Sequence, residues 1–182
     1  RLKSDSPQLS KRLGTSVNSV YDLETGSKIE PLAADSQKQD GLNPHAAIVD
    51  EYHAHKDSDL LEVLETGMGA REQPLVSIIT TAGFNKAGPC YLLRKVVCDI
   101  LEGKKQDDST FGIIYTLDEG DDWKDEKNWI KANPNIGRTP LWDYMRDQFT
   151  KAINEGVSKE VQFKTKNLNI WTDSSMAWLN DE

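Results

Sequence analysis

Two consecutive acidic residues, Asp50 and Glu51, follow a run of four apolar residues at 46–49. Such a run is typical of a strand buried on both faces of a parallel sheet, and it places the two carboxylates at the sheet edge where open α/β proteins bind ligands. There Asp50 could hold hydrated Mg²⁺, and Glu51 could orient and deprotonate an attacking water. This is the Walker B pattern of nucleoside triphosphatases, although any buried strand followed by two surface acids has the same form.

A second polar strand end follows about thirty residues later, where Thr80, Thr81 and Gly83 come after the apolar pair Ile78 and Ile79. Hydroxyl groups at this position could sense the γ-phosphate of a nucleotide, or its water, and pass that state to an adjoining nucleic-acid site. Alone, the segment is equally well a strand exit rich in Ser and Thr. Two neighbouring strands that both deliver polar groups to one edge favour a site.

The elements that must position these residues alternate along the chain. Short apolar runs predict strands at 17–23, 28–33, 46–49, 75–80 and 111–117. Helical spacing predicts helices at 57–66, 89–102, 139–155 and 159–168, the third with a capping Thr139 and with Pro140 in its first turn. The first two strands flank a turn and predict a hairpin, and the alternation from residue 46 onward indicates an α/β domain with a mainly parallel sheet.

Length and composition limit the classes of protein to which this chain can belong. The chain has 182 residues, which suits one globular domain and is short for two of ordinary size. Its longest apolar stretches are strand-sized, far below the ~20 residues of a membrane helix. A formal charge of -8 excludes a uniformly basic nucleic-acid footprint. Because the chain begins at Arg1 without an initiator Met and ends just after Trp178 and Leu179, we expect a piece of a longer polypeptide.

Five further segments extend the pattern around Asp50 and Glu51: residues 41–45, 64–71, 80–84, 129–134 and 169–171. In residue type and in order, they resemble the large terminase subunit of tailed bacteriophages, in the branch with HK97-type capsids. Such proteins join an N-terminal DNA-packaging ATPase to a C-terminal metal-dependent nuclease. The resemblance covers nearly the whole chain, which makes it far more specific than the acidic pair.

The resemblance implies roles for particular residues. Glu51 is the catalytic base, and Asp50 is the ligand of Mg²⁺ in Mg-ATP. Thr80, Thr81 and Gly83 bind the nucleotide together with Asp50, and Thr80, Thr81 and Ala82 form the motif that couples hydrolysis to DNA movement. The implied cofactors are ATP and Mg²⁺. The implied partners are double-stranded viral DNA, the terminase small subunit and the portal protein, in a homo-oligomeric motor of the bacterial cytoplasm without a membrane component.

The same resemblance implies the fold, a partial P-loop NTPase (RecA/ASCE-like) with a mainly parallel sheet, flanking helices and a helical linker region. We expect residues 1–120 to be the C-terminal part of the ATPase domain, and 121–182 to be a helical segment leading toward a nuclease domain. No G-x-x-x-x-G-K-[ST] loop occurs, and we expect the nuclease carboxylates beyond Glu182, so the chain alone should be inactive. The stretch 38–41 leaves the arginine finger unassigned, and Arg71 fits a surface arginine better than a phosphate sensor.

Two alternatives stay open. Asp50, Glu51 and His53 also fit the Asp-Glu-x-His box of superfamily-two helicases, although the chain after Phe111 has no second RecA-like repeat. The chain could instead be a non-catalytic folding or assembly module that docks through exposed sheet edges. His53 and His55 form only a weak metal-binding pattern, and we expect most of the five tryptophans to serve packing rather than base stacking.

Overall fold

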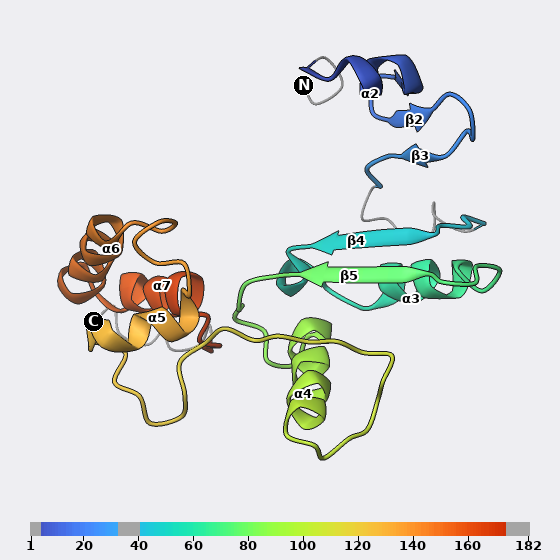
Figure 1. Ribbon diagram of the computed structural model, residues 1–182. Coiled ribbons are helices and arrows are strands. Elements are labelled where there is room, and N and C mark those ends of the chain that lie inside the picture. The colour runs from blue at the N-terminus through green and yellow to red at the C-terminus, as the bar shows by residue number, and fades with distance from the viewer. Residues whose placement is uncertain (1–4, 33–40, 174–182) are drawn as a thin grey trace.

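The computed structural model describes residues 5–32 and 41–173 (Figure 1). At the N-terminal end, a short helix α2 (Pro7–Arg12) leads into an antiparallel sheet of β1 (Leu13–Thr15), β2 (Val20–Asp22) and β3 (Lys28–Ile29). The Asp22 carboxylate accepts the backbone N–H groups of Glu24 and Thr25, which fixes the turn between β2 and β3. The predicted hairpin is therefore confirmed, with shorter strands than the sequence indicates. Neither α2 nor β1 was predicted.

The parallel strands β4 (Ala46–Asp50) and β5 (Leu75–Ile79) lie side by side, paired in register from Ala46 opposite Leu75 to Asp50 opposite Ile79. A short 3-10 turn η2 (Tyr52–Ala54) and helix α3 (Asp59–Gly67) connect them, and helix α4 (Pro89–Leu101) follows β5. This confirms the predicted strand–helix–strand–helix order. Parallel strands need such a crossover because the end of one strand and the start of the next lie at opposite edges of the sheet.

One face of the β4–β5 pair carries the first core. Val49, Tyr52, Leu64 and Cys90 are buried together there, so the sheet packs against η2, α3 and α4. On the other face Ile48 is 75% exposed, and Leu75 and Ile79 are exposed with it. The prediction that the strand at 46–49 is buried on both faces is wrong for the described chain, because the helices cover only one face and successive side chains of a strand alternate between faces.

The predicted third strand, at 111–117, is also wrong, because these residues have no regular secondary structure and pair with no strand of the described chain. Phe111 is 87% exposed. The end of the segment is held instead by Asn169, which follows helix α7 (Val157–Leu168). The side-chain amide of Asn169 donates to the Tyr115 carbonyl at 3.0 Å, and the Thr116 hydroxyl donates to the backbone carbonyl of Asn169 at 3.0 Å. An apolar run becomes a strand only beside a partner that accepts its backbone hydrogen bonds.

The C-terminal helices form a separate group, to the left of the sheet in Figure 1. They comprise η3 (Glu126–Asn128), α5 (Trp129–Ala132), α6 (Trp142–Asn154) and α7. Helix α6 begins at Trp142, so the predicted start at Thr139 and Pro140 is wrong. Those two residues belong to a turn in which the Gly137 N–H donates to the Pro140 carbonyl at 2.8 Å, and Leu141 is still extended.

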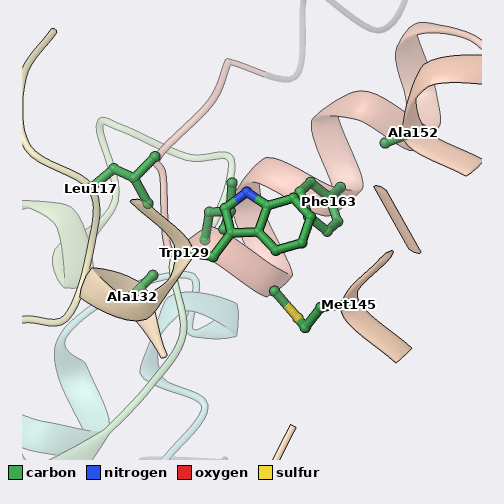
Figure 2. Packing of buried hydrophobic residues seen from close by; sticks show 7 residues of the cluster. Leu117, Trp129, Ala132, Met145, Ala152 and Phe163 are labelled. Atoms are coloured by element: carbon green, nitrogen blue, oxygen red, sulfur yellow. The ribbon is translucent and has the colours of Figure 1, made fainter. Parts of the chain in front are cut away.

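A second core holds the C-terminal helices together. Figure 2 shows the Trp129 indole lying against Phe163, with Met145 beside it. Trp129 is only 1% exposed, and its ring centroid lies 5.5 Å from that of Phe163. Its Nε1 donates to the Trp123 carbonyl at 2.8 Å. The expectation that tryptophans serve packing is confirmed for Trp129; Trp178 lies outside the described residues.

Candidate active site

The parallel register of β4 and β5 determines which polar groups meet at the sheet edge. Because Asp50 lies opposite Ile79, the residues that follow each strand, Glu51 and Thr80, emerge at the same end of the sheet. This is the edge at which open parallel sheets place ligands. The structure therefore brings together the acidic pair and the hydroxyl segment that the sequence analysis singled out.

Asp50 is exposed at the end of β4. Its Oδ1 accepts the Glu51 N–H at 2.9 Å, and within the described part of the chain no hydrogen bond engages Oδ2. Magnesium prefers oxygen ligands, keeps several waters and takes one or two carboxylates from the protein. An exposed carboxylate with one oxygen available fits that donor chemistry.

Glu51 occupies the left-handed region, with φ 52° and ψ 43°. A non-glycine residue in this region costs about 1–3 kcal/mol, and such residues cluster at functional sites. The conformation reverses the chain, so that the Ala54 N–H donates to the Glu51 carbonyl at 2.8 Å. The Glu51 side chain remains 57% exposed, with Oε2 3.0 Å from Nδ1 of His53. Its carboxylate is thus accessible to a water on one side and held by a ring on the other.

His53 joins the two strand ends. Its backbone N–H donates to the Thr80 hydroxyl at 3.0 Å, and its Nδ1 lies 3.0 Å from the same oxygen. The Thr80 hydroxyl in turn donates to the Thr81 carbonyl at 2.9 Å. Sequence reasoning considered His53 only as a metal ligand or as part of a helicase box, and missed this role. Its spacing after the acidic pair was the signal that pointed to it.

The segment after β5 is held by residues at the C-terminal end of α7. Nζ of Lys166 donates to the Thr81 hydroxyl at 3.2 Å, and the Ala82 N–H donates to the Asn169 carboxamide oxygen at 3.3 Å. Lys166 and Asn169 lie more than eighty residues further along the chain. Nothing in the sequence identifies them as neighbours of Thr81, so sequence reasoning missed both.

His53 and Lys166 form an unusual pair, with Nζ of the lysine 2.8 Å from Nε2 of the histidine. Burial lowers the pKa of His53, and the nearby Lys166 cation lowers it further, against the opposing charge of Glu51. The ring is therefore neutral at pH 7, since even its ordinary pKa lies below that value. A neutral ring can donate through one nitrogen and accept through the other.

Gly83 is buried where space is limited, because an added Cβ would lie 3.1 Å from Cβ of His53 and 3.3 Å from Cζ3 of Trp171. We expect Gly83→Ala to lower the free energy of unfolding by about 1–3 kcal/mol, the usual cost of overpacking. Urea unfolding followed by fluorescence measures it. Gly69→Ala is the control, since a Cβ there meets only the Thr66 carbonyl at 3.5 Å. Equal midpoints for the two variants would contradict the packing argument.

Other residues weighed from the sequence lie away from this edge or have ordinary contacts. Nη2 of Arg71 donates to the Asn43 carbonyl at 2.6 Å, as expected of a surface arginine. The His55 ring packs beside Tyr52, with ring centroids 5.2 Å apart. Among the described residues no group of three His, Cys, Asp or Glu side chains could hold a metal ion, and no helix is long and apolar enough to cross a membrane. Residues 38–40, considered for an arginine finger, lie outside the described residues.

Comparison with known proteins bears on the whole chain. The family model of the terminase large subunit ATPase domain matches residues 6–98, and that of the terminase large subunit endonuclease domain matches residues 104–182. The crystal structure of the HK97 bacteriophage large terminase superposes on 93% of this chain and 35% of that one, with a TM-score of 0.78 and 26% identity. The fold is thus mixed α/β, with a parallel sheet and helices consistent with a partial P-loop-like fold.

Relatives found by sequence indicate the same family. Protein YmfN of Escherichia coli strain K12 is 50% identical over 141 residues, which is 78% of this chain and 31% of the relative. The large terminase subunit of Enterobacteria phage HK97 is 29% identical over 149 residues, which is 81% of this chain and 28% of the relative. The chain therefore spans about a third of the length of the relatives it matches. These matches confirm the resemblance over the helicase alternative, and the chain belongs to the terminase large subunit family.

Proposed function

We propose that the edge formed by Asp50, Glu51 and Thr80 takes part in ATP hydrolysis by a viral DNA-packaging motor. The observation that carries this proposal is the meeting of the two strand ends, where His53 contacts both the Glu51 carboxylate and the Thr80 hydroxyl at 3.0 Å. Membership of a family with an ATPase domain supplies the class of reaction. When bound, Mg²⁺ would neutralise charge that develops on the phosphates.

Each residue then has a defined task. Asp50 holds the metal through the carboxylate oxygen that its own chain leaves available. Glu51 orients the attacking water and accepts its proton, which its exposed carboxylate allows. Thr80 and Thr81 contact His53 and Lys166, so they can transmit the state of the nucleotide toward α7. Gly83 keeps the segment close to His53.

The 182-residue chain alone should not hydrolyse ATP. Its sequence contains no glycine-rich loop ending in lysine, which in P-loop enzymes contacts the β- and γ-phosphates. We assign residues 1–120 to the C-terminal part of the ATPase domain and 121–182 to the helical segment leading toward the nuclease. The second core draws on the C-terminal helices and on no residue of β4 or β5, which supports two packing units, but it also includes Leu117 and therefore does not fix the boundary at residue 120.

The partners follow from the family. The substrate of the motor is double-stranded viral DNA, and the terminase small subunit and the portal protein are its protein partners. The motor works as a homo-oligomer in the cytoplasm of the bacterial host. A net charge of -8 places the DNA-contacting surface on local basic patches or on other parts of the full-length protein.

Calorimetric titration with Mg-ATP tests the proposal. We expect the full-length terminase to bind Mg-ATP and the 182-residue chain to bind it at least about 100-fold more weakly, because it lacks the phosphate-binding loop. In the full-length protein, Asp50→Asn should weaken Mg-ATP binding about tenfold, since it removes the charge that holds the metal.

Asp108→Asn provides the matched control for Asp50→Asn, because it makes the same change in the exposed loop after α4. Its affinity for Mg-ATP should equal that of the unmodified protein. Micromolar binding by the 182-residue chain would contradict the fragment assignment. Equal affinity of the Asp50→Asn and Asp108→Asn proteins would remove Asp50 from the metal site.

A further inference from the structure

We infer that Lys166, on helix α7, is a positioning residue for Glu51 and acts through His53. The inference rests on the proposed function, in which Glu51 is the base of ATP hydrolysis. It adds a residue from the C-terminal helical segment, far from either strand in the sequence, to the hydrolysis edge. Four contacts among five side chains carry it.

The first step concerns which nitrogen of His53 holds the proton. A lysine ammonium group has three donors and no acceptor. Nζ of Lys166 lies 2.8 Å from Nε2 of His53, so Nε2 must accept and cannot carry a hydrogen. In the neutral ring the proton is then on Nδ1. Lys166 therefore determines the tautomer of the ring.

The second step concerns where that proton points. Nδ1 lies 3.0 Å from Oε2 of Glu51 and 3.0 Å from the Thr80 hydroxyl. The hydroxyl already donates to the Thr81 carbonyl, so it can face the ring only as an acceptor. Both neighbours of Nδ1 are thus acceptors: the hydrogen bond of the ring goes to the Thr80 hydroxyl, and the positive end of the same N–H group lies 3.0 Å from Oε2 of Glu51 and attracts that carboxylate. The other tautomer would turn a lone pair toward a carboxylate and repel it.

The third step concerns what holds the lysine. Nζ of Lys166 also donates to the Thr81 hydroxyl at 3.2 Å, so the ammonium group bridges the two segments that follow β4 and β5. One residue past the end of α7, the Asn169 side chain accepts the backbone N–H of Ala82. The end of α7 is therefore fastened to the hydrolysis edge at two points, and a shift of that helix would move the ring that orients Glu51.

Lys166 would affect hydrolysis by fixing the position of the Glu51 carboxylate. Glu51 needs its carboxylate aligned with the attacking water, and a misplacement of about 1 Å can cost 100-fold in rate. Removing Lys166 leaves Glu51 in place but frees the His53 ring to change tautomer. The loss should therefore appear in kcat and leave nucleotide affinity nearly unchanged, because neither Lys166 nor His53 is assigned to the nucleotide and Asp50, which holds its metal, lies outside these contacts.

The first test is nuclear magnetic resonance of the 182-residue chain. Long-range proton–nitrogen spectra of its three histidines report the protonation of each ring nitrogen directly. We expect the Nδ1–H tautomer for His53 in the unmodified chain and in Lys159→Met, a change on the same helix. Lys166→Met should measurably raise the share of the Nε2–H tautomer, because a proton on Nε2 then no longer meets the ammonium group, although Thr80 and Glu51 still favour Nδ1–H. An Nε2–H tautomer in the unmodified chain, or no change in Lys166→Met, would overturn the inference.

The second test measures ATP hydrolysis by the full-length terminase. Lys166→Met should lower kcat about tenfold with the KM for ATP within about twofold. Lys159→Met should leave both constants unchanged, and Lys166→Arg, which keeps a cationic donor, should restore most of the rate. Equal kcat for Lys166→Met and Lys159→Met would overturn the inference. If Glu51→Gln is also fully active, the proposed function fails with it; if Glu51→Gln is inactive, only the role of Lys166 is lost.

Discussion

Replacing Glu51 by glutamine in the full-length terminase is expected to lower kcat for ATP hydrolysis by about 100-fold or more, the contribution of a positioned general base. Glutamine has the same shape and keeps an oxygen that can lie beside Nδ1 of His53, where Oε2 now lies at 3.0 Å. It cannot accept a proton from water. The loss should therefore lie in the chemical step, with the affinity for Mg-ATP changed by less than about threefold.

Steady-state hydrolysis and calorimetric titration on the same protein separate these two quantities. Glu65→Gln, on the exposed side of α3, is the matched control because it removes the same charge from the same part of the chain. A Glu51→Gln protein that turns over ATP as fast as Glu65→Gln would show that another group activates the water. A protein that loses nucleotide affinity together with rate would instead assign Glu51 to binding.

The part of this site that sequence could predict is the part that is local along the chain. Asp50 and Glu51 follow an apolar run, and Thr80 follows another, so strand periodicity and the rule that parallel strands end at one edge predict their meeting. The left-handed backbone of Glu51 is not predictable in this way, since glutamate rarely adopts it. It arises from the sharp turn into η2.

The contacts of Lys166 and Asn169 could not be predicted because they depend on how α7 packs against the sheet edge. A lysine in an amphipathic helix is ordinarily a solvated side chain, and no residue type in α7 marks one end as a site. Only the packing of helix against sheet brings Nζ to 2.8 Å from His53. Sequence patterns describe elements well and describe the docking of distant elements poorly.

Two predictions were wrong, the burial of the strand at 46–49 on both faces and the presence of a strand at 111–117, and they have one physical cause. Apolar runs at 46–49 and 111–117 both have the composition of buried strands, but burial depends on what covers them. Ile48 is 75% exposed because the described helices lie on one face only. Phe111 is exposed because its segment has no strand partner among the described residues. In each case the sequence supplies the apolar side chains of a buried strand, but no element of the described chain covers them.

Replacing Trp129 by alanine is expected to lower the free energy of unfolding of the C-terminal helical segment by about 3–5 kcal/mol, the usual cost of removing a large buried aromatic residue. Trp129 is 1% exposed and packs against Phe149 and Phe163, with ring centroids 5.3 and 5.5 Å away. The change also removes the hydrogen bond from Nε1 to the Trp123 carbonyl. A partly buried carbonyl that loses its donor adds to the cost of the cavity.

Urea unfolding of the 182-residue chain, followed by hydrogen exchange at individual amides, measures this loss for each core separately. Tyr144→Ala is the control, since Tyr144 lies on α6 and is half exposed; it should change stability by less than about 1 kcal/mol. Amides of α7 should lose protection in Trp129→Ala, while those of β4 and β5 keep theirs, because the sheet has its own core. Uniform loss over both cores would show instead that the chain unfolds as one unit.

Loosening α7 in this way should also reach the hydrolysis edge. Phe163 and Leu168 anchor α7 in the Trp129 core, and Lys166 lies between them in sequence. If the helix end becomes mobile, Nζ of Lys166 no longer stays at Nε2 of His53, and the ring loses the partner that fixes its tautomer. The His53 nitrogen signals of Trp129→Ala should therefore shift toward those of Lys166→Met. Unshifted signals, together with a destabilised α7, would mean that the lysine contact survives independently of the helix core.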